Sequence, residues 1–191
     1  MLKLIILTLS FLLITSQFAL SDDTQIIKNA IRNFHGLCYA PEANFNQIQK
    51  LIKTFNYQKM PKEFAEAVGT PGTTKSELYM IEHPAKGKGI LFGFGEPNSC
   101  AVFVRGVDYS KIKTLMVEEF NLKHLYTENQ GLQTNESYIP NGKSGSKAEA
   151  SSKGIIMLMY SSSTLMPPGC TIGYLPPERV GEILKKTNNL N

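Results

Sequence analysis

The sequence predicts an α+β domain in which helices are segregated from a mainly antiparallel sheet. Apolar residues recur at helical spacing in the first part of the chain, whereas short runs rich in Leu, Ile, Val, Phe and Tyr follow residue 74. Tight connections between these runs favour antiparallel pairing, because parallel strands need a long crossover. We expect an N-terminal helix pair packed on the sheet, one internal helix and a C-terminal helix.

The first 21 residues have the pattern of a secretory signal peptide. Lys3 gives a positive start, an apolar run extends to Ile14, and the small residues Ala19 and Ser21 mark a cleavage site. The alternative is an uncleaved membrane anchor, but the apolar run is about half of the ~20 residues that a spanning helix needs. We therefore expect residues 1–21 to be removed, with no stable membrane insertion afterwards.

Length and charge limit what the rest of the chain does. Residues 22–191 are long enough for one globular domain with its own core. The formal net charge is only +4, and the lysines are scattered rather than clustered with aromatic residues. This distribution argues against nucleic-acid binding. Together with the leader, it predicts a periplasmic or secreted protein.

Two helices and a short helical turn are expected before residue 69. The first runs over about residues 22–39, and the second begins at Asn44, whose side chain can cap it. Pro61 opens the helical turn, and residues 69–74 form a loop by composition. The first helix has an apolar stripe at three- and four-residue spacing, formed by Ile26, Ile27, Ala30, Ile31, Phe34 and Cys38.

A strand meander follows, and then a second helix–strand region. Strands are expected over residues 78–82, 89–94 and 100–105. Asp108 can cap the internal helix, and residues 124–139 have the weak alternation of an edge hairpin.

The last part of the chain combines a polar segment with its most apolar one. Residues 141–153 are rich in Ser, Gly and Lys, which predicts a flexible loop. The continuous apolar run 155–160 predicts a central strand covered on both faces. Residues 171–175 are its expected hairpin partner, and Pro176 begins a closing helix that extends to Lys186.

Three cysteines follow the leader, Cys38, Cys100 and Cys170. Outside the cytosol cysteines tend to pair, so one disulfide and one free thiol are the simplest outcome. A bond from Cys38 to Cys100 and a bond from Cys100 to Cys170 close loops of similar length. Loop entropy therefore does not choose between them.

The order of elements resembles a known protein family. A cysteine on the first helix is followed by a Pro-x-x-Phe turn at residues 61–64 and a Ser-Cys-x-Val-Phe strand at residues 99–103. Over residues 24–120 the chain is similar to an uncharacterised family of small exported proteins of Gram-negative bacteria. The resemblance implies a periplasmic or secreted single domain in which Cys38 pairs with Cys100. It carries no known activity, so it implies no catalytic residue.

Two sets of residues are candidates for function. His35 and Cys38 lie three residues apart on one helix, as in a Cys–His nucleophile or half of a metal site. Cys38 continues the apolar stripe, however, and no second ligand pair has this spacing, so we expect a buried or disulfide-bonded cysteine and no metal. The other set is an apolar loop tip that either contacts a partner or folds back over the sheet. It consists of Leu165, Met166, Pro167 and Pro168.

These observations favour a non-enzymatic exported protein that binds another envelope or secreted protein, without a cofactor. One alternative is an envelope enzyme with Cys38 or Cys100 as its nucleophile. Another is a carrier of a small ligand, held in a pocket between the sheet and the first two helices.

We expect the protein isolated from producing cells to begin at Asp22, because the leader ends in small residues at positions 19 and 21. Mass spectrometry of the N-terminal peptide measures this directly. A protein that keeps Met1 and has all its thiols reduced would contradict the prediction.

Overall fold

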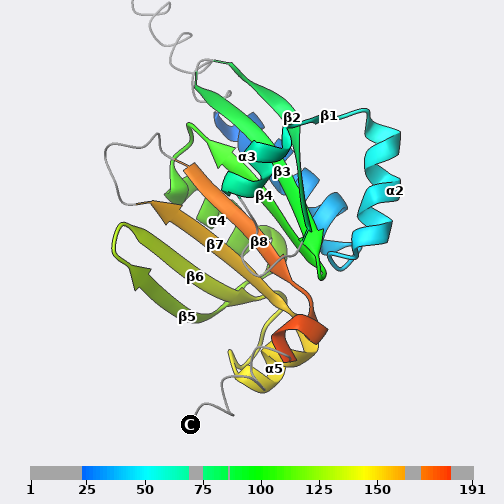
Figure 1. Ribbon diagram of the computed structural model, residues 1–191. Coiled ribbons are helices and arrows are strands. Elements are labelled where there is room, and N and C mark those ends of the chain that lie inside the picture. Colours follow the sequence, from blue (N-terminus) through cyan, green and yellow to red (C-terminus); the bar gives the residue numbers. More distant parts are fainter. Residues whose placement is uncertain (1–22, 69–74, 86, 162–168, 182–191) are drawn as a thin grey trace, which may run out of the picture.

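Helices and an eight-stranded antiparallel sheet make up the fold (Figure 1). The computed structural model describes residues 23–68, 75–85, 87–161 and 169–181. A helix over residues 23–34 comes first and continues into a π-helical turn, η1. The further elements are η1 (His35–Tyr39), α2 (Phe45–Phe55), β1 (Gln58–Lys59), α3 (Lys62–Val68), β2 (Lys75–Ala85), β3 (Lys88–Glu96), β4 (Ser99–Arg105), α4 (Tyr109–Phe120), β5 (Lys123–Gln130), β6 (Gln133–Ile139), α5 (Lys147–Lys153), β7 (Ile155–Ser161) and β8 (Gly169–Leu175).

The sheet consists of two antiparallel meanders that meet in its middle. Its strand order is β1-β2-β3-β4-β8-β7-β6-β5, so the first meander ends at β4 and the second at β8. Helix α4 carries the chain from β4 to the far edge at β5, and it lies behind β7 and β8 in Figure 1. The α+β class, the three-strand meander, the edge hairpin and the pairing of the last two strands are thereby confirmed.

The core lies between the sheet and the first helices together with α4. Phe34 meets Phe120 of α4 edge to face, with ring centroids 5.6 Å apart. Tyr39 packs in the same way on Tyr174 of β8, at 5.3 Å. These contacts bury the apolar stripe of the first helix, as its spacing predicted. The face of the sheet toward these helices is thus closed.

A disulfide joins this helical layer to the sheet. Cys38 of η1 is bonded to Cys100 of β4, with the two Cα atoms 5.3 Å apart. The pairing implied by the family resemblance is therefore confirmed. Cys170 on β8 is a buried free thiol.

The start of the first helix is held by two ion pairs. The Asp23 carboxylate lies 2.7 Å from the Lys88 ammonium and 3.1 Å from that of Lys111. Hydrogen bonds from the two lysines outweigh the small effect of burial and hold the pKa of Asp23 below its usual value. The first residue described in the chain is thus tied to β3 and α4.

Both expected helix caps are present. The Asn44 side chain accepts a hydrogen bond from the Gln47 amide at 3.1 Å. The Asp108 carboxylate accepts one from the Ser110 amide at 2.7 Å. Each satisfies a backbone N–H that a helix leaves without an internal partner.

The segment 141–153 is not the loop that its composition suggested, since it contains α5. Ser146 caps this helix by accepting a hydrogen bond from the Glu149 amide at 3.2 Å. The Glu149 carboxylate in turn accepts hydrogen bonds from the backbone amides of residues 143–145. Ser-x-x-Glu is the pattern of a capping box, and it orders the polar turn before the helix. The described residues therefore contain three internal helices, α3, α4 and α5, and not one.

Strand β7 is not covered on both faces as predicted. Ile156 and Leu158 are fully buried on the face toward α4, whereas Met157 and Met159 on the other face are partly exposed. A Cβ atom added to Gly173 of the neighbouring strand would lie 3.3 Å from the Met157 methyl carbon. On that face Met157 covers a glycine, and Ile155 is buried in a second, smaller hydrophobic cluster, which together account for much of the continuous apolar run.

The closing helix begins where it was expected. Residues 177–181 are helical, and the amides of Arg179 and Val180 bond to the Pro176 carbonyl. Its continuation to Lys186 lies outside the described residues. Among the described residues, none of the helices combines the length and the hydrophobicity needed to cross a bilayer.

Removing the disulfide should lower the free energy of unfolding by about 4 kcal/mol, because the bond closes a loop with a sequence separation of 62. Urea unfolding of a Cys38→Ala/Cys100→Ala variant measures this loss. The control is Cys170→Ala, which should remain sensitive to reductant, whereas the double variant should not respond. Equal sensitivity of the double variant and the unmodified protein to reductant would contradict the prediction.

Candidate functional site

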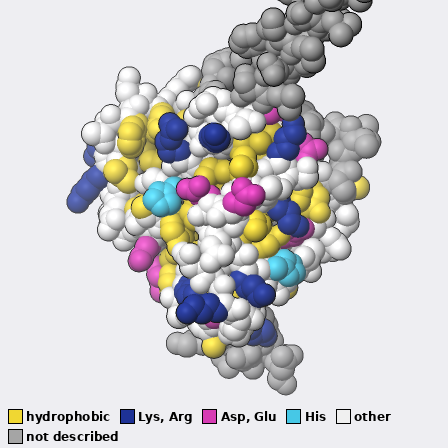
Figure 2. All heavy atoms as spheres, turned by 180° about the vertical axis from the view of Figure 1, so that it is seen from behind, with side chains coloured by type: hydrophobic (Ala, Val, Ile, Leu, Met, Phe, Trp, Pro, Cys, Tyr) yellow, Lys and Arg dark blue, Asp and Glu magenta, His cyan; other side chains and the backbone are white. Residues whose placement is uncertain are grey.

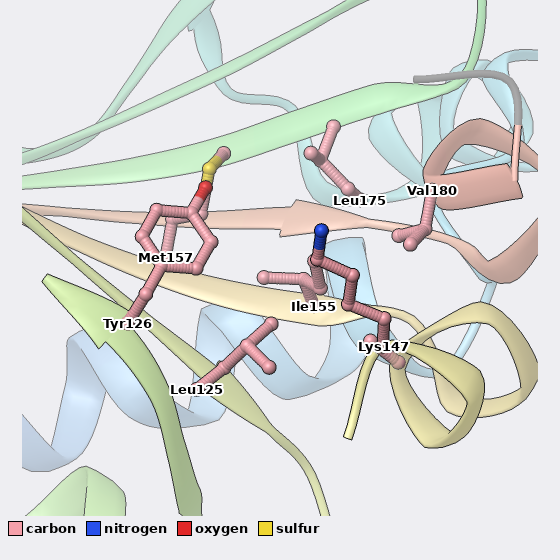
Figure 3. A pocket seen from close by; sticks show the side chains of 8 residues that line it. Leu125, Tyr126, Lys147, Ile155, Met157, Leu175 and Val180 are labelled. Atoms are coloured by element: carbon pink, nitrogen blue, oxygen red, sulfur yellow. The ribbon is translucent and has the colours of Figure 1, made fainter. Parts of the chain in front are cut away.

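A pocket lies on the face of the sheet away from α4, at the end where α5 and residues 177–181 approach the strands (Figure 3). Its volume is about 190 Å³. Most of its wall is aliphatic, and the apolar lining consists of Leu125, Ala150, Ile155, Met157, Leu175 and Val180.

Strand alternation places these side chains on one face. Neighbouring residues of a strand point to opposite faces, so Ile155 and Leu175, which are paired in register, point away from Ile156 and Tyr174 of the main core. They form a second, smaller hydrophobic cluster with Ala150 of α5 and with residues of β6 and the closing helix. The pocket is the part of this cluster that the helices leave unfilled.

Two polar side chains complete the wall, Tyr126 of β5 and Lys147 of α5. Figure 3 shows the Lys147 chain extending over the pocket, with its ammonium between the aliphatic side chains. Within the described part of the chain, neither the Lys147 ammonium nor the Tyr126 hydroxyl has a hydrogen-bond or ion-pair partner. These two groups are therefore available to a ligand.

The end of the molecule around the pocket is positively charged. Residues 141–154 contain three lysines and one glutamate, a net charge of 3 − 1 = +2. The one carboxylate, that of Glu149, is bonded to the Lys153 ammonium at 2.9 Å. Figure 2, which views the molecule from the α4 side opposite the pocket, shows Lys and Arg side chains at this same lower end. The surroundings of the pocket thus favour an anion.

A buried polar cluster lies on the other face of the sheet, beneath α4. The carboxylate of Glu136 on β6, 8% exposed, accepts hydrogen bonds from the Tyr109 hydroxyl at 2.6 Å and from the Tyr138 hydroxyl. The Lys113 ammonium lies 2.8 Å from the same carboxylate. The Tyr109 ring stacks on Tyr160 of β7 at 3.8 Å. The cluster holds the start of α4 on the sheet.

Electrostatics set the protonation states of this cluster. Burial alone would raise the pKa of Glu136, but the hydrogen bonds from Lys113, Tyr109 and Tyr138 outweigh it and keep the pKa below its usual 4.5. Burial and the neighbouring carboxylate raise the pKa of Tyr138 to about 12. At neutral pH Glu136 is therefore ionised and the tyrosines are protonated. A carboxylate in this state does not act as a general acid.

The candidate nucleophiles are not thiols in this structure. Cys38 and Cys100 are bonded to each other, and His35 lies beside the rings of Tyr39 and Phe120 at 5.9 Å from each. Burial raises the pKa of the Cys170 thiol, which disfavours the reactive thiolate. Within the described ranges, His, Cys, Asp and Glu side chains form no group of three that could hold a metal ion.

Neither the binding loop nor the ligand pocket that the sequence suggested coincides with this pocket. The expected partner-binding loop, Leu165, Met166, Pro167 and Pro168, lies outside the described residues, so its role stays a prediction. A ligand pocket was considered between the sheet and the first two helices. There, Phe45 of α2 packs against Phe94 of β3 at 5.2 Å. The pocket found here is on the opposite face of the sheet.

Neither the lining of this pocket nor the Glu136 cluster was found from the sequence. The pocket combines β5, α5, β7, β8 and the closing helix, so its residues show no common spacing. A weak signal was available in β7, where apolar residues occupy both alternating sets of positions.

Comparison with known proteins adds no relative: no family model, curated protein or solved structure matches the chain. The resemblance to a family of exported proteins therefore stays a prediction.

We expect Glu136→Gln to lower the free energy of unfolding at pH 7 by about 2 kcal/mol, because it removes a charged partner from buried hydrogen bonds. The folded-state pKa of Glu136 is below 4.5, so its ionised form stabilises the fold above that pH. This stabilisation is lost as the pH falls through the folded-state pKa. The difference between the two proteins should therefore shrink below about pH 4.5.

Urea unfolding at a series of pH values tests this. Glu119→Gln, an exposed substitution on α4, is the matched control, since it changes the net charge equally. An identical loss in both variants would show that the buried cluster has no special role.

Proposed function

We propose that this protein is an exported, non-enzymatic binding domain that holds a small apolar molecule in the pocket beside α5. The observation that carries this proposal is the pocket itself, a preformed cavity with aliphatic walls and two polar groups that have no partner among the described residues. Ligand sites in proteins commonly have this composition, with a few polar groups that orient the ligand.

Two observations support export. The leader has the order of a secretory signal peptide. The Cys38–Cys100 disulfide is a feature typical of proteins outside the cytosol. The proposed location is accordingly the periplasm or the extracellular space.

Binding is favoured over the enzymatic alternative by the state of the candidate groups. The alternative needs a thiolate at Cys38 or Cys100, and these residues share a disulfide. The most concentrated set of titratable side chains, around Glu136, is satisfied internally. The available polar groups at the pocket, in contrast, are suited to orienting a ligand.

Blocking the pocket should abolish ligand uptake. The chain contains no tryptophan, so Leu125→Trp both fills the pocket with an indole ring and reports on its environment. We expect the probe 1-octanol to bind the unmodified protein in titration calorimetry and to bind Leu125→Trp at least tenfold more weakly. The new tryptophan should emit at short wavelength, as a buried indole does.

Leu132→Trp is the matched control, because Leu132 lies on the same hairpin but is 67% exposed. It should bind the probe as the unmodified protein does, and its tryptophan should emit at long wavelength. Equal probe binding by both variants, with Leu125→Trp folded by circular dichroism, would refute the proposal.

A further inference from the structure

The charge at the pocket indicates which class of molecule it takes. Resting on the proposed function, we infer that the ligand is a small anionic amphiphile, whose short apolar tail enters the pocket and whose carboxylate or similar anionic group meets Lys147. A free monocarboxylate of medium chain length has this chemistry. The inference depends on three features: the volume of the cavity, its apolar wall and the position of one cation.

The volume limits the tail. A cavity of about 150 Å³ lined by aliphatic side chains takes up a benzene ring. On the same scale the 190 Å³ of this pocket hold a chain of about seven carbon atoms. The wall offers aliphatic groups to such a chain, and each buried methylene favours binding.

The position of Lys147 does not stabilise α5, but it brings the ammonium group to the pocket. It is the first residue of α5 after the Ser146 cap, and a cation at the N-terminal end of a helix is unfavourable. Its ammonium has no ion-pair partner within the described part of the chain, although it extends over the pocket (Figure 3).

No nearby carboxylate on the bordering helical segments neutralises this cation. Glu149 of α5 is engaged by Lys153 and by the amides of residues 143–145. Glu178, in the described turn of the closing helix, accepts a hydrogen bond from Asn98 at 3.1 Å. A ligand anion at the mouth of the pocket therefore gains a charge-assisted contact, with Lys147 as donor.

Titration calorimetry with octanoate and 1-octanol separates the tail from the charge. We expect octanoate to bind about five times more tightly than octanol, which is the scale of one ion pair at a partly exposed site. Lys147→Met should remove this preference without changing octanol binding, and Lys147→Arg should keep it. Lys143→Met is the matched control, because it changes the net charge equally on the turn before α5, and it should keep the preference.

The outcomes distinguish the two proposals. If octanol and octanoate bind equally and Lys147→Met changes neither, the pocket binds apolar molecules but the anionic class is wrong. If neither compound binds, the proposed function itself fails.

Sedimentation with phosphatidylglycerol vesicles tests a membrane as the source of the anion. Vesicle binding that Lys143→Met and Lys147→Met weaken equally, without binding of octanoate, would overturn the inference in favour of a basic membrane-docking surface.

Discussion

The Cys38–Cys100 bond is the constraint on which the arrangement of the two layers depends. Cys100 lies on β4, and its backbone is paired with Phe94 of β3 on one side and Tyr174 of β8 on the other. A covalent link at this position fixes η1 over the middle of the sheet. Tyr39 can then contact Tyr174 of β8, so both meanders are packed against the same helical turn. The disulfide holds η1 in position over the sheet, and the buried aromatic contacts stabilise that arrangement.

Most of the helical residues cover one face of the sheet, so fewer are left to cover the other face. Helix α3 covers part of the second face beside β2, and on the other half of the sheet helices reach this face at the end beside α5 and residues 177–181, where a small hydrophobic cluster forms. A cluster bordered by a seven-residue helix does not fill the space above the strands. The pocket is thus a consequence of the uneven distribution of helices, and the basic segment that leads into α5 determines the charge at its mouth.

Local signals predicted much of the fold, and long-range contacts account for what was missed. Asn44 and Asp108 were recognised as caps because a cap needs only its own helix. Helix α5 was missed because its seven residues are mostly polar, so that only the Ser-x-x-Glu pattern at its start and Gly154 at its end marked it locally. The Glu136 cluster joins Tyr109 to a strand 27 residues later, a contact that no spacing rule anticipates. The pocket brings together five segments, namely β5, α5, β7, β8 and the closing helix, and no spacing rule anticipates that combination either.

The pairing of β4 with β8 also determines the order in which the chain can fold. Strand β8 is the last of the eight in sequence, yet it lies beside β4 in the middle of the sheet. A nascent chain therefore presents β4 as an unpaired edge until residue 175 has emerged, and an open edge invites pairing with other chains. Contacts this distant in sequence also form slowly. The topology therefore leaves the β4 edge open until the last strand of the chain has paired with it.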